Sequence, residues 1–112
     1  MKLDIEHIQD GAGAIVTIRC ENLDAGNIKA FKDGLMPILE NHGAVLLDMH
    51  QLSFVDSSGL GALLSCLRTM NNKSGQLKLF AMAKPVQALF ELVRMHRIFA
   101  IYNNRDEALA AL

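Results

Sequence analysis

The sequence has few of the residues on which several classes of small protein depend. Its 112 residues include two cysteines, two prolines, one tyrosine and no tryptophan. Cys20 and Cys66 lie far apart and do not resemble the disulfide framework of a small secreted domain, so we expect two buried, reduced thiols. No apolar run approaches the ~18 residues of a membrane span. The N-terminus alternates charged and apolar residues and has no signal-peptide core. The sequence therefore predicts a cytoplasmic protein without membrane insertion.

The sequence also lacks an excess of charge of either sign. Eleven basic and twelve acidic residues leave a net charge of −1, and the basic residues are scattered along the chain. A nucleic-acid-binding surface normally shows a basic excess, so we expect no direct nucleic-acid partner. The length suits one domain with its own core, which predicts a single domain over residues 1–112. No long amphipathic seam is left over once the core is assigned, so we expect a monomer when the chain is free.

Short apolar stretches alternate with helical patterns along the chain. The pattern predicts strands at 3–8, 14–20, 44–49, 76–82 and 98–102, and helices beginning near residues 28, 57, 85 and 104. A turn signal at 10–13 makes the first two strands an antiparallel hairpin, and residues 21–27 are predicted to be a loop. The later strands alternate with helices and should be parallel. The sequence thus predicts an α/β fold with a mixed sheet of four to five strands and about four helices.

Particular residues mark the ends and buried faces of these helices. Asp56 or Ser57 can cap the second helix, and Asn103 or Asn104 the last one. Pro37 lies inside the first helix and should bend or shorten it. Pro85 fits the first position of the third helix. The buried face of that third helix is predicted to consist of Val86, Leu89, Phe90 and Val93.

The motifs of several enzyme classes are absent. A nucleophile elbow needs a glycine two residues before its serine, and neither Ser57 nor Ser58 has one. No phosphate-binding loop is present. Gly59 and Gly61 match the first two glycines of a dinucleotide fingerprint, but Leu64 occupies the third position. The sequence therefore predicts a protein that is not an enzyme. A small nucleotide-binding protein remains an alternative, which tight binding of ATP or GTP would favour.

The metal-ligating residue types show no metal-site pattern. The four histidines have no ligand spacing with one another or with the cysteines, so we expect surface or loop histidines. Asp24, Asp48 and Asp56 could gather at the strand ends and bind a cation. Capping and hydrogen-bonding roles are commoner for such residues in α/β domains. We therefore expect neither a metal nor a cofactor.

The turn after the third strand remains as a candidate site. The segment Phe54-Val55-Asp56-Ser57-Ser58-Gly59 places two hydroxyls at the start of a helix. The carboxyl ends of strands and the helix starts that follow them are where sites form in α/β sheets. Taken alone, the segment is most simply interpreted as a helix N-cap with a tight turn.

The flanking residues favour a functional interpretation. Residues 46–64, from Leu46 through Asp48 and the Asp56–Gly61 motif to Leu64, resemble the signature of the STAS family, and within it the bacterial anti-sigma factor antagonists. Residues 21–25 resemble the family's loop before its first helix, with Asn22 as an apparent insertion. Residues 84–92 resemble its third helix. In the family a glycine often follows that helix, whereas here Arg94 to His96 stand in its place.

The resemblance implies a STAS-like fold and a partner-switching mechanism. In that mechanism the unphosphorylated protein binds an anti-sigma factor that is a serine kinase, is released when phosphorylated, and is reset by a serine phosphatase. The phosphorylated residue maps to Ser57, with Ser58 as the rival. The residues expected to bind the partner are Asp24, Asp56, Ser57, Ser58, Gly59 and Leu60. The alternative within the fold is a STAS subunit of a membrane transporter complex, which would bind constitutively.

Overall fold

The two N-terminal strands form the hairpin that their alternating pattern predicts. In the computed structural model, which describes residues 1–112, β1 (Leu3–Ile8) pairs antiparallel with β2 (Gly13–Ile18). The turn between them is the single 3-10 turn η1 (Gln9–Gly11), in which all three residues have positive φ. The predicted second strand was too long, because β2 ends at Ile18 and leaves Cys20 outside it.

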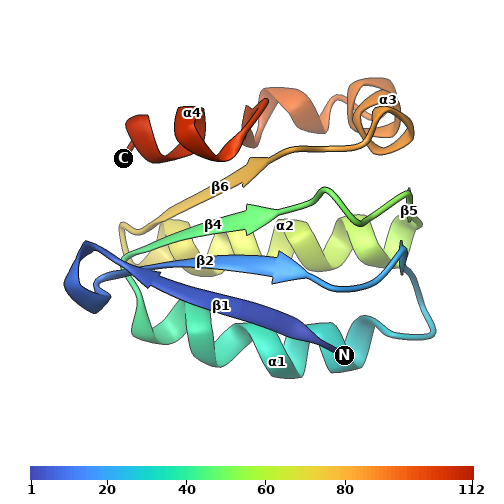
Figure 1. The fold of residues 1–112 in the computed structure, drawn as a ribbon. Coiled ribbons are helices and arrows are strands. Elements are labelled where there is room, and N and C mark those ends of the chain that lie inside the picture. Colours follow the sequence, from blue (N-terminus) through green and yellow to red (C-terminus); the bar gives the residue numbers. More distant parts are fainter.

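Three further strands continue the sheet with the predicted parallel direction. They are β4 (Ala44–Asp48), β6 (Gln76–Phe80) and β7 (Ala100–Tyr102), and the strand order is β1-β2-β4-β6-β7 (Figure 1). Each pair after the hairpin is parallel. The α/β mixed sheet of five strands is therefore confirmed. The parallel strands β2, β4 and β6 end at the same edge of the sheet.

A second, very small sheet lies at that edge and was not predicted. It consists of β3 (Asn22–Leu23) and β5 (Phe54–Val55), which pair in parallel. The loop predicted at 21–27 therefore contains a short strand. Two residues are too few to show an alternating pattern, so sequence periodicity could not reveal either strand.

The four predicted helices are α1 (Ile28–Asn41), α2 (Ser57–Asn72), α3 (Lys84–Leu92) and α4 (Arg105–Ala110). Pro37 does not shorten α1, which continues past it for another turn. Pro85 is the second residue of α3 rather than the first. Asn104 caps α4 as predicted, because its side-chain oxygen accepts a hydrogen bond of 2.9 Å from the backbone N–H of Glu107. Val93 lies beyond the end of α3 and is 45% exposed, so its predicted burial was wrong.

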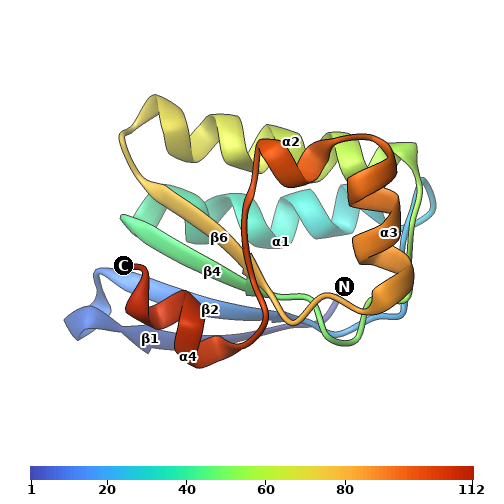
Figure 2. The same cartoon turned by 90° about the horizontal axis from the view of Figure 1, so that it is seen from above.

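The helices cover both faces of the main sheet. Helices α1 and α2 lie side by side on one face, and α4 lies on the other (Figure 2). Val16, Val45 and Leu47 point to the α1–α2 face and belong to the main core, whereas Ile15 and Leu46 belong to a small core beneath α4. This alternation along β2 and β4 is what strands buried on both faces require.

The two cysteines differ in their surroundings. Cys66 is buried in the main core, and this burial raises the pKa of its thiol to about 11, which keeps the thiol protonated. Cys20 is only half-buried, contrary to the prediction, because it lies beyond the end of β2. Burial and, secondly, the charge of Asp24 raise the pKa of the Cys20 thiol. Both cysteines are free thiols, as the sequence predicts.

Arg94 occupies the strained position that follows α3. Its backbone is left-handed, with φ 61° and ψ 25°, a conformation that costs a non-glycine residue about 1–2 kcal/mol. We expect Arg94→Gly to stabilise the fold by about 1 kcal/mol, because part of the gain is offset by the greater freedom of glycine in the unfolded chain. Urea denaturation measures the difference. Arg97→Gly is the matched control at an exposed arginine without positive φ, and we expect it to lower stability. Equal effects of the two changes would contradict the strain at Arg94.

Candidate functional site

Ser57 is the first residue of α2, at the edge where the parallel strands end (Figure 1). Its side chain is exposed, and its hydroxyl forms no hydrogen bond within the chain. Ser58, the rival residue, is half-buried in the same helical turn. Of the two hydroxyls, the one on Ser57 is therefore the more accessible to a second protein.

Asp56, rather than Ser57, is the N-cap of α2. One carboxylate oxygen of Asp56 accepts a hydrogen bond of 2.9 Å from the backbone N–H of Gly59. The other accepts one of 3.1 Å from the backbone N–H of Ala25. Asp56 thus joins the start of α2 to the loop before α1. Because Asp56 does the capping, the Ser57 hydroxyl is left available.

Gly59 lets α2 approach β3 and β5 closely. A Cβ atom at Gly59 would lie 2.5 Å from the carbonyl oxygen of Leu23 and 2.7 Å from Cγ1 of Val55. Both distances are shorter than real Cβ contacts, and the first is to backbone, which cannot rotate away. Leu60, the next residue, is half-buried and packs against the main core. The motif therefore fixes the position of α2 as well as presenting its first serine.

The loop before α1 is held by its own hydrogen bonds. The Asp24 carboxylate accepts a bond of 2.9 Å from the N–H of Gly26, and the Asn27 side-chain oxygen accepts one of 3.0 Å from the N–H of Asp24. The Asn27 amide also donates to the carbonyl of Asn22 at 2.7 Å. Asn22, which looked like an insertion, is part of β3 and pairs with Phe54. Asp24 is therefore fixed in a loop that is bonded directly to Asp56.

The two carboxylates beside Ser57, those of Asp24 and Asp56, have no cationic partner. The four ion pairs of the chain join Arg19 to Asp4, Lys29 to Asp33, His50 to Asp48 and Arg105 to Glu6. None involves Asp24 or Asp56. Asp48 pairs with His50 at 2.8 Å, and the three carboxylates considered for a cation site do not form a group that could hold a metal ion. No group of three or more His, Cys, Asp or Glu side chains is placed to hold a metal ion.

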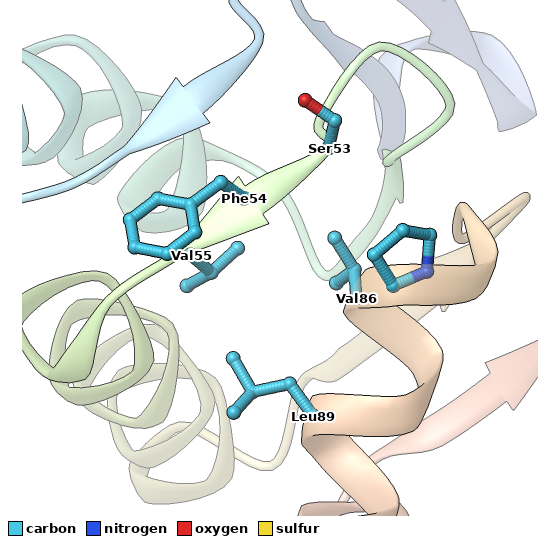
Figure 3. Close-up of a pocket in the computed structure, with 6 residues that line it drawn as sticks. Ser53, Phe54, Val55, Val86 and Leu89 are labelled. Atoms are coloured by element: carbon cyan, nitrogen blue, oxygen red, sulfur yellow. The ribbon is translucent and has the colours of Figure 1, made fainter.

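An apolar hollow of about 250 Å³ lies beside the serine-bearing turn. Figure 3 shows β5 on one side of it and α3 on the other. It is lined by Ser53, Phe54, Val55, Pro85, Val86 and Leu89. Phe54, three residues before Ser57, is 53% exposed. The sequence motif included Phe54 but could not show its exposure, which arises because β5 pairs only with β3.

Comparisons with known proteins agree on one family. Residues 3–108 match the STAS domain family. An anti-sigma F factor antagonist of Paenibacillus polymyxa is 34% identical over 68 residues, which are 61% of this chain and 58% of that protein, so the match spans little more than half of that relative. An anti-sigma-B factor antagonist of Listeria monocytogenes is 26% identical over 108 residues, which are 96% of this chain and 95% of that protein.

The fold is also found among solved structures. The Bacillus cell fate determinant SpoIIAA in its phosphorylated form superposes with a TM-score of 0.73 at 16% identity and covers 98% of each chain. At that identity the likeness shows the fold alone.

None of the four helices has both the length and the apolar character needed to cross a membrane.

Proposed function

The chain belongs to the STAS domain family, and from that premise we propose that it is an anti-sigma factor antagonist controlled by phosphorylation of Ser57. The unphosphorylated chain binds an anti-sigma factor that is also a serine kinase, and phosphorylation releases it. A serine phosphatase then restores the binding form. The chain is a monomer when free, acts in the cytoplasm where the kinase has ATP, and catalyses nothing itself. The observation that carries the proposal is the exposed, unbonded hydroxyl of Ser57 at the first position of α2.

The surroundings of Ser57 suit a residue that carries a phosphate. The backbone N–H groups of Ser57 and Ser58 precede the first intrahelical hydrogen bonds and donate to no other group of the chain. A helix N-terminus with such groups favours an anion. Phosphorylation therefore leaves the fold intact. Ser58 is the weaker candidate because it is half-buried.

The same surroundings explain why a phosphate would weaken binding. Phosphorylation adds about −1.5 to −2 charges beside Asp24 and Asp56, neither of which has a cationic partner. A partner that covers this edge would have to remove water from the dianion without a compensating cationic side chain from this chain. The proposed contact surface consists of Asp24, Asp56, Ser57, Ser58 and Leu60, together with Phe54. Gly59, which the sequence also placed there, is buried against β3 and β5 and positions α2 instead.

A pull-down from the source lysate tests the proposal. The baits are the wild type, Ser57→Ala and Ser57→Asp, and mass spectrometry identifies what each retains. The proposal predicts that the first two baits retain a serine kinase of the anti-sigma type and that the third does not. Retention of one transporter component by all three baits would favour the transporter alternative, and binding that is independent of residue 57 would overturn the switch.

The exposed Phe54 ring gives a prediction for the partner surface. We expect Phe54→Ala to weaken binding of the captured kinase by about tenfold or more, since exposed aromatic residues beside a hollow are typical binding anchors. Stability should change little, because Phe54 is already 53% exposed. Ile5→Ala is the matched control, since Ile5 is 47% exposed on β1. Titration calorimetry measures both affinities, and equal affinities for the two variants would remove Phe54 from the contact surface.

A further inference from the structure

Two histidines that are 35 residues apart in sequence meet at the other end of the sheet. His7 is an exposed residue of β1, and His42 is the residue that directly follows α1. The Nδ1 atom of His7 lies 3.2 Å from Nε2 of His42, and the ring centroids are 5.3 Å apart. The sequence predicted surface or loop histidines, whereas His42 is buried, with 9% of its surface exposed.

The backbone fixes which nitrogen of His42 faces its neighbour. Nδ1 of His42 lies 2.7 Å from the carbonyl oxygen of Ile38, in the last turn of α1. A carbonyl can only accept a hydrogen bond, so Nδ1 carries the proton and donates it. In the neutral ring, Nε2 therefore presents its lone pair to Nδ1 of His7, which donates a hydrogen bond to it. A cation binds both nitrogens once the His7 proton has moved from Nδ1 to the other ring nitrogen. A histidine that ligates a metal almost always has this arrangement, in which its other ring nitrogen donates to a carbonyl or carboxylate.

We propose that His7 and His42 form a binding site for one late first-row divalent cation, with Cu²⁺ bound most tightly. Two imidazole nitrogens each about 2.0–2.1 Å from one ion lie roughly 2.9 Å apart in the tetragonal geometry that Cu²⁺ prefers and roughly 3.3 Å apart in tetrahedral geometry. The observed separation of 3.2 Å lies within this range. Imidazole suits copper, nickel and zinc, and the usual order of affinities places copper first. No third His, Cys, Asp or Glu side chain joins the pair. Water completes the coordination, and the cation enters from the exposed side of His7.

This histidine pair is separate from the proposed phosphorylation site. His42 lies at the C-terminal end of α1 and just before β4, whereas Ser57 lies beyond the end of β4 at the opposite edge (Figure 1). A bound cation would join β1 to the end of α1 in place of the hydrogen bond between His7 and His42. Loss of the cation site would leave the Ser57 switch intact, and failure of the switch would leave the cation site intact.

Titration calorimetry of the tag-free chain with Cu²⁺ and with Ni²⁺ tests the proposal. Every protein carries Cys20→Ser, which removes the half-buried thiol as a competing ligand. We expect one cation per chain, tighter binding of Cu²⁺ than of Ni²⁺, and no binding of Mg²⁺. His7→Ala should weaken Cu²⁺ binding by at least about tenfold. His96→Ala is the control, because it removes another exposed histidine and should leave the affinity unchanged.

A second measurement locates the ion. Substoichiometric Cu²⁺ should broaden the NMR signals of His7 and His42 and leave those of Ser57 and Ser58 sharp. Because His7 is exposed, His7→Ala should fold normally, which circular dichroism verifies. Three results would overturn the proposal. They are no Cu²⁺ binding by the folded chain, an equal loss of Cu²⁺ affinity in His7→Ala and His96→Ala, and a stoichiometry of one cation per two chains.

Discussion

Ser57→Asp should lower the affinity for the captured kinase by at least about 100-fold, while Ser57→Ala should bind as the wild type does. A 100-fold loss corresponds to about 2.8 kcal/mol, which lies within the penalty for burying one uncompensated charge. Titration calorimetry or surface plasmon resonance measures the affinities. The phosphorylated chain should lose more affinity for the kinase than Ser57→Asp does, because a phosphate carries up to one additional negative charge.

The size of this effect follows from the position of the new charge. At the start of α2 a carboxylate is well tolerated by the helix, so the free chain should stay folded and equally stable. The penalty falls on the complex, because Asp24 and Asp56 are already negative and no lysine or arginine pairs with them. The loss should therefore appear in binding and not in the thermal midpoint.

Two variants separate position from charge. Ser74→Asp places the same charge on an exposed serine just beyond the other end of α2, and it should bind as the wild type does. Ser58→Asp tests the rival residue. If Ser58→Asp abolished binding while Ser57→Asp retained it, Ser58 would replace Ser57 as the regulatory residue.

Gly59→Ala should be the most destabilising single methyl addition in the motif. The new Cβ would lie 2.5 Å from the carbonyl oxygen of Leu23 and 2.7 Å from Val55, so α2 would have to move away from β3 and β5. Overpacking of this kind costs about 1–3 kcal/mol, and a backbone contact favours the upper part of that range. A loss of about 2 kcal/mol should lower the thermal midpoint by roughly 10 °C.

Gly61→Ala is the matched control, two residues further along the same helix. A Cβ atom at Gly61 meets nothing within 4 Å, so only the helix propensity changes. Alanine is better than glycine in a helix by about 0.8–1.0 kcal/mol, and Gly61→Ala should therefore stabilise the chain. Differential scanning calorimetry compares the two variants. Similar midpoints for both would show that α2 is not held against β3 at Gly59.

The sequence predicted the elements whose patterns extend over several turns or residues. The helical stripes of α1 and α2 and the alternation in β1 gave the fold class and the order of the elements. The cap of α4 could be predicted as Asn103 or Asn104, because a capping side chain bonds to a backbone N–H only three residues away. The Asp56–Gly61 motif was found because its residues are contiguous. In each case the determining interactions lie within about four residues of sequence.

The features that were missed depend on distant residues. Strands β3 and β5 exist because Glu21 and Leu23 supply carbonyls to the N–H groups of Ser53, Phe54 and Asp56. The sequence offered both Asp56 and Ser57 as the cap of α2, and it could not show that Ala25, 31 residues away, donates to the second oxygen of Asp56. The exposure of Phe54 and the meeting of His7 with His42 likewise come from tertiary packing. Val93 followed the apolar period of α3 but lies beyond its end.

The most direct measurement is the site of phosphate transfer. The purified chain is incubated with the captured kinase and ATP, and tandem mass spectrometry of the peptide containing residues 54–60 locates the phosphate. The proposed switch predicts one phosphate on Ser57 in the wild type, none in Ser57→Ala, and dissociation of the modified chain. Phosphate on Ser58 alone, or a complex that persists with Ser57 phosphorylated, would contradict it.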